Sequence, residues 1–192
     1  MWWCPTGPFS FLPIHAAGIY SNDGENISDY AISSYTPTLN ALLSPPLSFS
    51  DPFKMLAVIQ PHTPNQSDLP FTKYELEKIK SHVSSEHLVE RGTLESPSSV
   101  ESVMLHLSDI SIAHFACHGE QNPSKPLESA LLLTDGSLKI SQIMEKTLQK
   151  ASLAFLSACQ TATGDGNFAD EAIHIAATML FSGFRGVVGT MW

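Results

Sequence analysis

Five short apolar runs of strand length alternate with stretches of helical periodicity, and this alternation is the feature that most constrains the fold. The runs span residues 55–59, 87–90, 110–117, 152–158 and 185–191. The helical stretches begin at the predicted caps Thr72, Ser96, Ser141 and Asn167. Strands and helices in such alternation form a mostly parallel sheet with helices packed on both faces. We therefore expect an α/β fold built around a central sheet of this kind.

Short local motifs predict where single helices begin and where the chain turns. Thr72 and Glu75 match a capping box, in which the acidic side chain returns to the helix N-terminus. Ser96 followed by proline matches the start of another helix. An Asp135-Gly136 pair between two apolar runs predicts a β-hairpin. The polar residues 120–128 are expected to form an exposed loop.

The first 50 residues differ in composition from the rest of the chain. They are rich in Pro, Ser and Tyr, carry few charges, and include a Pro45-Pro46 pair that cannot lie inside a helix or a central strand. From Lys54 onward the strand and helix pattern is regular. We therefore divide the chain into an N-terminal flanking part, residues 1–50, and a core, residues 51–192.

Charge, hydropathy and cysteine usage argue against several classes of partner. The net charge is −9, with no run of Lys and Arg to contact phosphates. No segment reaches the ~18 apolar residues of a membrane span, and the N-terminus lacks the pattern of a signal peptide. The three cysteines are an odd number without the spacing of a disulfide framework. We expect an intracellular, cytoplasmic protein that binds neither nucleic acid nor a membrane.

Two of the predicted strands end at reactive side chains, His118 and Cys159. The carboxyl ends of parallel strands meet at one edge of a sheet, where α/β folds place their chemistry. A thiol near an imidazole suits nucleophilic catalysis, because the thiolate attacks and the histidine transfers the proton. Gly119 lets a substrate carbonyl approach the backbone closely, so the N–H groups of Gly119 and Cys159 are candidates for an oxyanion hole. This chemistry needs no metal or organic cofactor.

Two residues close to His118 have simpler explanations. Strand side chains alternate between faces, so His114 and His118 share one face while Cys117 points to the other. We expect Cys117 to be a core residue and His114 a buried, hydrogen-bonded histidine. A zinc site formed by these three residues and Cys159 is disfavoured, because the alternation divides the ligands and no zinc-ligand spacing is present.

Acidic residues follow Cys159 within a few positions. Asp170 and Glu171 suit the first turn of the helix capped by Asn167, where negative charge is favourable. Asp165 lies in the preceding loop and is a candidate to line a pocket for a basic substrate side chain. The alternative is that Asp165 only stabilises a turn.

Read together, His118-Gly119 and Ser157-Ala158-Cys159-Gln160-Thr161 resemble the motifs of the CHAT domain family. Its members are caspase-like and separase-like modules, commonly found beside tetratricopeptide repeats. The likeness also includes residues 12–18, 114–119 and 186–192, and so covers most of the chain. The resemblance implies a caspase-like three-layer α/β sandwich.

The resemblance also implies a function. It implies a cysteine peptidase in which His118 is the general acid/base, Cys159 is the nucleophile, and Gly119 and Cys159 supply the oxyanion-hole amides. It implies a protein or peptide substrate and a regulatory region of tetratricopeptide repeats as partner. The family pattern continues beyond Trp192 into another helix and strand, so we expect an isolated or truncated module.

The leading interpretation is a CHAT-type cysteine endopeptidase domain that acts in a regulated signalling setting. Two alternatives stay open. One is a catalytically inactive module that keeps the fold for interaction and signalling. The other is a thiol-based acyltransferase or hydrolase that acts on a non-peptide substrate.

Overall fold

The computed structural model describes residues 1–21, 23–43, 53–122, 124–157 and 175–189. These residues divide into two compact units, one comprising residues 1–43 and the other residues 53–122, 124–157 and 175–189.

The first unit contains a two-stranded parallel sheet of β1 (Trp2–Trp3) and β2 (Ser34–Tyr35). Two short 3-10 helices (Gly7–Phe11 and Ile14–Ala16) and α1 (Ile27–Tyr30) lie between these strands in sequence, and α2 (Leu39–Leu42) follows β2. The hydroxyl group of Tyr35 lies 2.9 Å from the backbone nitrogen of His15 and 2.8 Å from its Nδ1. These bonds attach the second 3-10 helix to β2.

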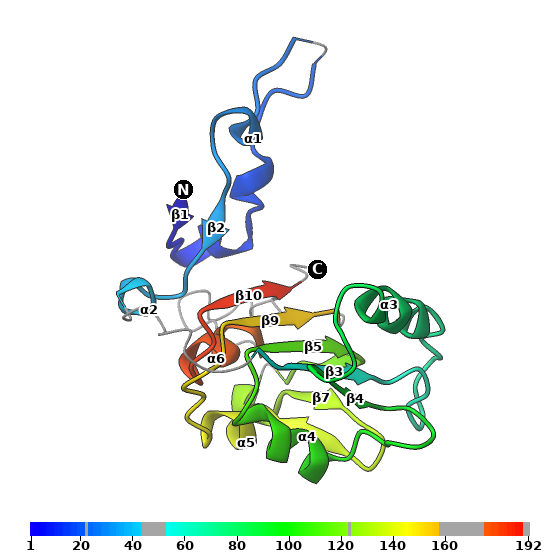
Figure 1. Ribbon diagram of the computed structural model, residues 1–192. Coiled ribbons are helices and arrows are strands. Elements are labelled where there is room, and N and C mark those ends of the chain that lie inside the picture. Colours follow the sequence, from blue (N-terminus) through cyan, green and yellow to red (C-terminus); the bar gives the residue numbers. More distant parts are fainter. Residues whose placement is uncertain (22, 44–52, 123, 158–174, 190–192) are drawn as a thin grey trace. The chain divides into compact units, whose positions relative to one another are not determined.

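The second unit is built on a five-stranded sheet (Figure 1). In chain order its strands are β3 (Met55–Ile59), β4 (Leu88–Arg91), β5 (Ile112–Ala116), β9 (Leu153–Leu156) and β10 (Gly186–Gly189). The spatial order is β4-β3-β5-β9-β10, and every pairing is parallel. The chain thus winds outward from β3 in both directions, which is a doubly wound topology. The expected α/β fold with a mostly parallel sheet is confirmed.

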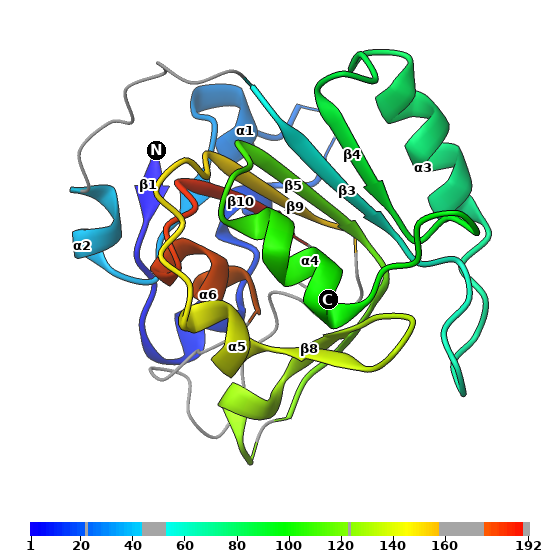
Figure 2. The same ribbon diagram turned by 60° about the horizontal axis from the view of Figure 1, so that its bottom comes forward.

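Helices cover both faces of this sheet (Figure 2). One face carries α3 (Phe71–Lys80), whose Leu76 packs in a small cluster with Ala57, Ile59 and Ala116. The other face carries α4 (Val100–Leu107), α5 (Ile140–Met144) and α6 (Ile175–Phe181), which enclose the larger hydrophobic core. The central strands β3 and β5 have apolar residues on both faces, because both of their faces are buried. The resulting three layers are consistent with a caspase-like sandwich.

None of the helices in these described ranges is long and apolar enough to cross a lipid bilayer.

A small antiparallel sheet follows β5 in the chain. Its strands are β6 (His118–Glu120), β7 (Ala130–Leu132) and β8 (Ser137–Lys139), and a 3-10 helix (Pro126–Glu128) precedes β7. The predicted hairpin at Asp135-Gly136 is confirmed as the β7–β8 connection. The predicted loop over residues 120–128 is wrong at both ends, because Glu120 belongs to β6 and residues 126–128 are helical. β6 forms through backbone hydrogen bonds with β7, and its polar side chains do not show the apolar pattern from which a strand is predicted.

The starts of α4 and α5 are displaced from the predicted caps. Ser99, and not Ser96, caps α4, because its hydroxyl accepts a hydrogen bond from the backbone N–H three residues later at 3.1 Å. α5 begins after Lys139, before the predicted cap Ser141. Several serines precede α4, so cap preference alone does not choose between them. The predicted cap Asn167 lies outside the described residues.

A buried polar network attaches the hairpin to the end of β3. The side-chain oxygen Oε1 of Gln60 accepts hydrogen bonds from the hydroxyls of Ser98 and Thr134, the latter at 3.1 Å. Gln60 and Ser98 are both buried. The network therefore links β3, the segment before α4 and the β7–β8 hairpin at the carboxyl edge of the large sheet.

Candidate active site

The strands that lead to His118 and Cys159 are neighbours in the sheet. β5 and β9 pair in parallel, with Ile112 opposite Leu153 and Phe115 opposite Leu156. Beyond the strand, the backbone N–H of Ser157 donates to the carbonyl oxygen of Phe115 at 2.8 Å. The two strands therefore end side by side at the carboxyl edge of the sheet.

His118 lies two residues beyond β5, at the start of β6, and its side chain is half-buried. Its Nε2 lies 2.7 Å from the backbone carbonyl oxygen of Ser67. A carbonyl oxygen only accepts hydrogen bonds, so Nε2 carries the proton in this contact. In the neutral ring the lone pair is then on Nδ1, which is the form that takes a proton from an acid such as a thiol.

A second polar cluster joins α3 to the middle of β5 and to the residue that follows β9. Oε2 of Glu75 lies 2.8 Å from Nε2 of His114, and Oε1 of Glu75 accepts a hydrogen bond from the hydroxyl of Ser157 at 3.0 Å. The capping-box role predicted for Glu75 is wrong. α3 begins at Phe71, so Glu75 lies past the first turn, and the Thr72 hydroxyl donates to a backbone carbonyl instead of capping the helix.

The contacts of Glu75 with His114 and Ser157 are not predicted by the capping-box motif. One signal in the sequence points to this residue: Glu75 stands directly before Leu76 and four residues before Ile79, on the edge of the apolar stripe of α3. A carboxylate in that position borders the buried side of a helix. Its contacts with β5 and β9 come from the tertiary fold.

His114 is buried and lies on the α3 face of the sheet. Its ring stacks on Phe155, with centroids 5.1 Å apart and an interplanar angle of 16°. Burial lowers the pKa of His114, and the Glu75 carboxylate opposes that shift without reversing it. His114 is therefore a neutral donor to Glu75 near pH 7. The expectation of a buried, hydrogen-bonded histidine is confirmed.

Comparison with known protein families shows that the CHAT domain family model matches residues 1–192. The chain belongs to the CHAT domain family. This family is related to the caspase-like cysteine peptidases, in agreement with the three-layer fold. No curated protein matches the sequence of this CHAT domain.

Cys117 of the CHAT domain is a core residue, as expected. It is buried in the hydrophobic core on the face opposite His114. Burial raises the pKa of its thiol to about 12, so almost no thiolate exists at neutral pH. Cys117 and His114 therefore point to different sides of the sheet. Across the described ranges, no three His, Cys, Asp or Glu side chains are grouped to hold a metal ion.

The remaining predicted site residues are only partly described. Gly119 lies in β6, opposite Leu131 of β7. Cys159 and Asp165 lie outside the described residues, as do Asp170 and Glu171. The oxyanion hole of Gly119 and Cys159, the dyad and the Asp165 pocket therefore stay predictions.

Proposed function

We propose that this CHAT domain is a cysteine endopeptidase in which His118 and Cys159 form the catalytic dyad. The parallel pairing of β5 with β9 carries the proposal, because the segments that continue to the two residues leave the same edge of the sheet. His118 follows β5 by two residues, and Cys159 follows β9 by three. Family membership adds the relation to caspase-like cysteine peptidases.

The reaction follows from the chemistry of these two groups. Nδ1 of His118 takes the thiol proton, and the Cys159 thiolate forms a C–S bond with the scissile carbonyl carbon. The N–H groups of Gly119 and Cys159 stabilise the oxyanion. His118 then gives its proton to the leaving amine as the C–N bond breaks. Water hydrolyses the thioester, with His118 as base, and regenerates the thiol.

The Ser67 carbonyl supports the role assigned to His118. By accepting the Nε2 proton at 2.7 Å, it selects the tautomer and restricts rotation of the imidazole. It also stabilises the imidazolium that forms when the thiol is deprotonated. A neutral backbone acceptor here has the orienting role that a carboxylate has in other catalytic triads.

The substrate and partner belong to the same proposal. We assign a protein or peptide substrate, with Asp165 pairing with a Lys or Arg side chain before the scissile bond. The net charge of −9 favours the approach of basic peptides at low ionic strength. A tetratricopeptide-repeat region is the proposed regulator that links cleavage to a signal.

A thiol-directed acyloxymethyl-ketone probe tests the proposal on the 192-residue chain. Mass spectrometry would locate the labelled cysteine. We expect the probe to label Cys159 and this labelling to be lost in His118→Ala. Labelling of the exposed Cys4 measures non-specific alkylation. Equal labelling of Cys4 and Cys159, unaffected by His118→Ala, would instead favour an inactive interaction module.

A further inference from the structure

One carboxylate, that of Glu75, joins α3 to both strands that lead to the proposed dyad. Its two oxygens are used separately: Oε2 lies 2.8 Å from Nε2 of His114 on β5, and Oε1 lies 3.0 Å from the hydroxyl of Ser157 beyond β9. Ser157 stands two residues before Cys159 in the sequence. The contact therefore reaches the segment of chain that continues to the proposed nucleophile.

The surroundings of this carboxylate restrict its movement. The His114 side chain is only 9% exposed and that of Glu75 32%. His114 is the register partner of Phe155, on which its ring stacks. The hydrogen bond from Ser157 to Glu75 and the backbone bond from Ser157 to Phe115 hold the same residue at two points. The end of β9 is thus attached both to β5 and to α3.

The segment that carries Glu75 also contacts His118. Ser67, whose carbonyl oxygen accepts the His118 proton, lies four residues before the start of α3. The backbone N–H of Leu69 donates to Pro61 at 2.8 Å, and the Thr72 hydroxyl donates to Leu69 at 2.7 Å. These bonds connect the loop to the first turn of the helix. Residues 61–80 therefore contact both strand ends through Ser67 and Glu75.

We propose that Glu75 is a positioning residue for Cys159 that acts through Ser157. The inference rests on the proposed function, and it assigns no contact between Glu75 and a reacting atom. Glu75 keeps the exit of β9 at a set distance from α3, while the loop before α3 orients His118. Loss of the carboxylate should leave both dyad residues present but less well aligned.

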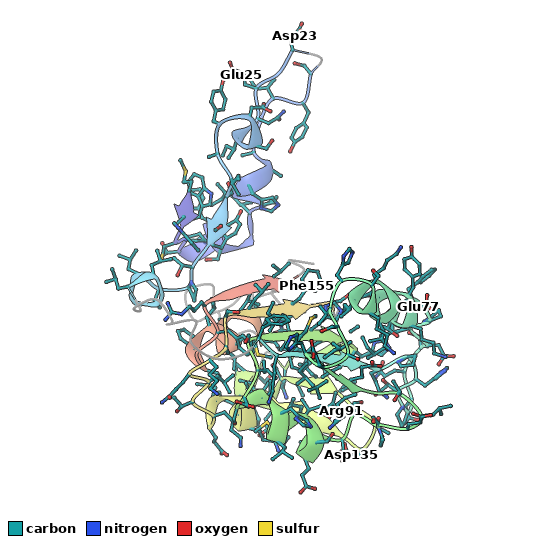
Figure 3. All side chains as sticks on the ribbon, viewed as in Figure 1. Asp23, Glu25, Glu77, Arg91, Asp135 and Phe155 are labelled. Atoms are coloured by element: carbon teal, nitrogen blue, oxygen red, sulfur yellow. The ribbon has the colours of Figure 1, made fainter. Side chains whose placement is uncertain are left out.

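The test measures the rate at which iodoacetamide alkylates Cys159 as a function of pH, in a Cys4→Ser background of the full chain. Glu75→Gln is compared with Glu77→Gln, which removes the same charge from an exposed position of the same helix (Figure 3). We expect Glu75→Gln to lower the His118-dependent rate near neutral pH by about 10- to 100-fold, because nucleophile alignment is sensitive to small displacements. Its pH profile should also move toward that of an ordinary thiol, near 8.5. Glu77→Gln should change the alkylation rate by no more than about twofold and should leave the pH profile in place.

A second variant separates positioning from folding. Ser157→Ala keeps the Glu75–His114 pair and removes only the bond to the end of β9, so it should reproduce the slower alkylation. The double variant should lose little more than the larger single loss, because the two residues act through one bond. Fully additive losses would contradict the proposal, as would a Ser157→Ala rate equal to that of the parent chain.

The outcomes distinguish this inference from the proposed function. If His118→Ala does not change Cys159 alkylation in the parent chain, the dyad and the role of Glu75 are both wrong. If the dependence on His118 is present and Glu75→Gln behaves like Glu77→Gln, only the positioning role is wrong.

Discussion

Nε2 of His118 lies 2.7 Å from the carbonyl oxygen of Ser67, and this contact ties the histidine of the proposed dyad to the loop before α3. The residue that accepts the proton does so through its backbone. The side chain at position 67 is therefore free to vary, whereas the path of the loop is not.

This distinction gives the first prediction. Ser67→Ala should change His118-dependent labelling of Cys159 by no more than about twofold, because a carbonyl oxygen remains. Leu69→Pro removes the N–H that bonds to Pro61 and should displace the carbonyl, lowering the labelling rate by at least about 10-fold. Rates measured with the acyloxymethyl-ketone probe decide the matter. Ser67→Ala being as damaging as Leu69→Pro would show that the side chain, and not the backbone, is needed.

The second prediction concerns the pH dependence of stability. Burial lowers the pKa of His114, so between this value and about 6.5 the unfolded chain binds more protons than the folded one. The free energy of unfolding should therefore fall as the pH drops below about 6.5. Urea titrations from pH 7.5 to pH 5 would measure this slope.

Substitutions of single histidines show which residue causes the slope of the free energy of unfolding against pH. His114→Gln should flatten it, while His82→Gln, at an exposed position, should not. His106, whose pKa is also lowered by burial and by Arg91, accounts for a remaining slope of the same sign. An unchanged slope in His114→Gln would show that His114 does not titrate as described.

The third prediction concerns the buried network at the end of β3. Gln60→Ala removes the acceptor shared by Ser98 and Thr134 and should lower the free energy of unfolding by about 1–3 kcal/mol, because the buried Ser98 hydroxyl then keeps only its contact with Thr134. The exposed Gln66→Ala is the matched control and should stay within about 0.5 kcal/mol. If Gln60→Ala and Gln66→Ala lower the free energy of unfolding equally in chemical denaturation, the buried network does not stabilise the fold.

The fourth prediction concerns specificity. A carboxylate at Asp165 that pairs with a basic substrate side chain contributes on the order of 1.5–3 kcal/mol, or roughly 10- to 150-fold in kcat/KM. A peptide library should show a preference for Lys or Arg before the cleaved bond that disappears in Asp165→Asn. A preference for apolar or acidic residues would remove Asp165 from the site and leave the dyad unaffected.

Much of the fold is predictable from the sequence because the central strands of the large sheet, β3 and β5, are buried on both faces. The run of residues 55–59 reads as a strand from its continuous apolar character and forms β3 with the same bounds. The alternation of β5 places Cys117 and His114 on opposite faces, as the period of a strand requires. The hairpin follows from Asp135-Gly136, whose preference for a turn is local.

The contacts that depend on tertiary structure were not predictable in the same way. Glu75 fits a capping box by spacing, yet the helix starts earlier and its carboxylate bonds to His114 and Ser157, which are 39 and 82 positions away. The Ser67 carbonyl leaves no trace in the sequence, because every residue has one. Local pattern indicates elements and reactive side chains, and it does not show which distant backbone or carboxylate orients them.

Peptide hydrolysis by single variants decides whether Cys159 and His118 form the catalytic dyad. Cys159→Ala should abolish cleavage, because no nucleophile remains, and His118→Ala should reduce it by roughly 10²–10⁴-fold, the usual contribution of a positioned proton-transfer group. Cys117→Ala, in the core, should alter stability more than turnover. Cleavage that survives Cys159→Ala, or that is lost in a correctly folded Cys117→Ala variant, would show that Cys159 is not the nucleophile.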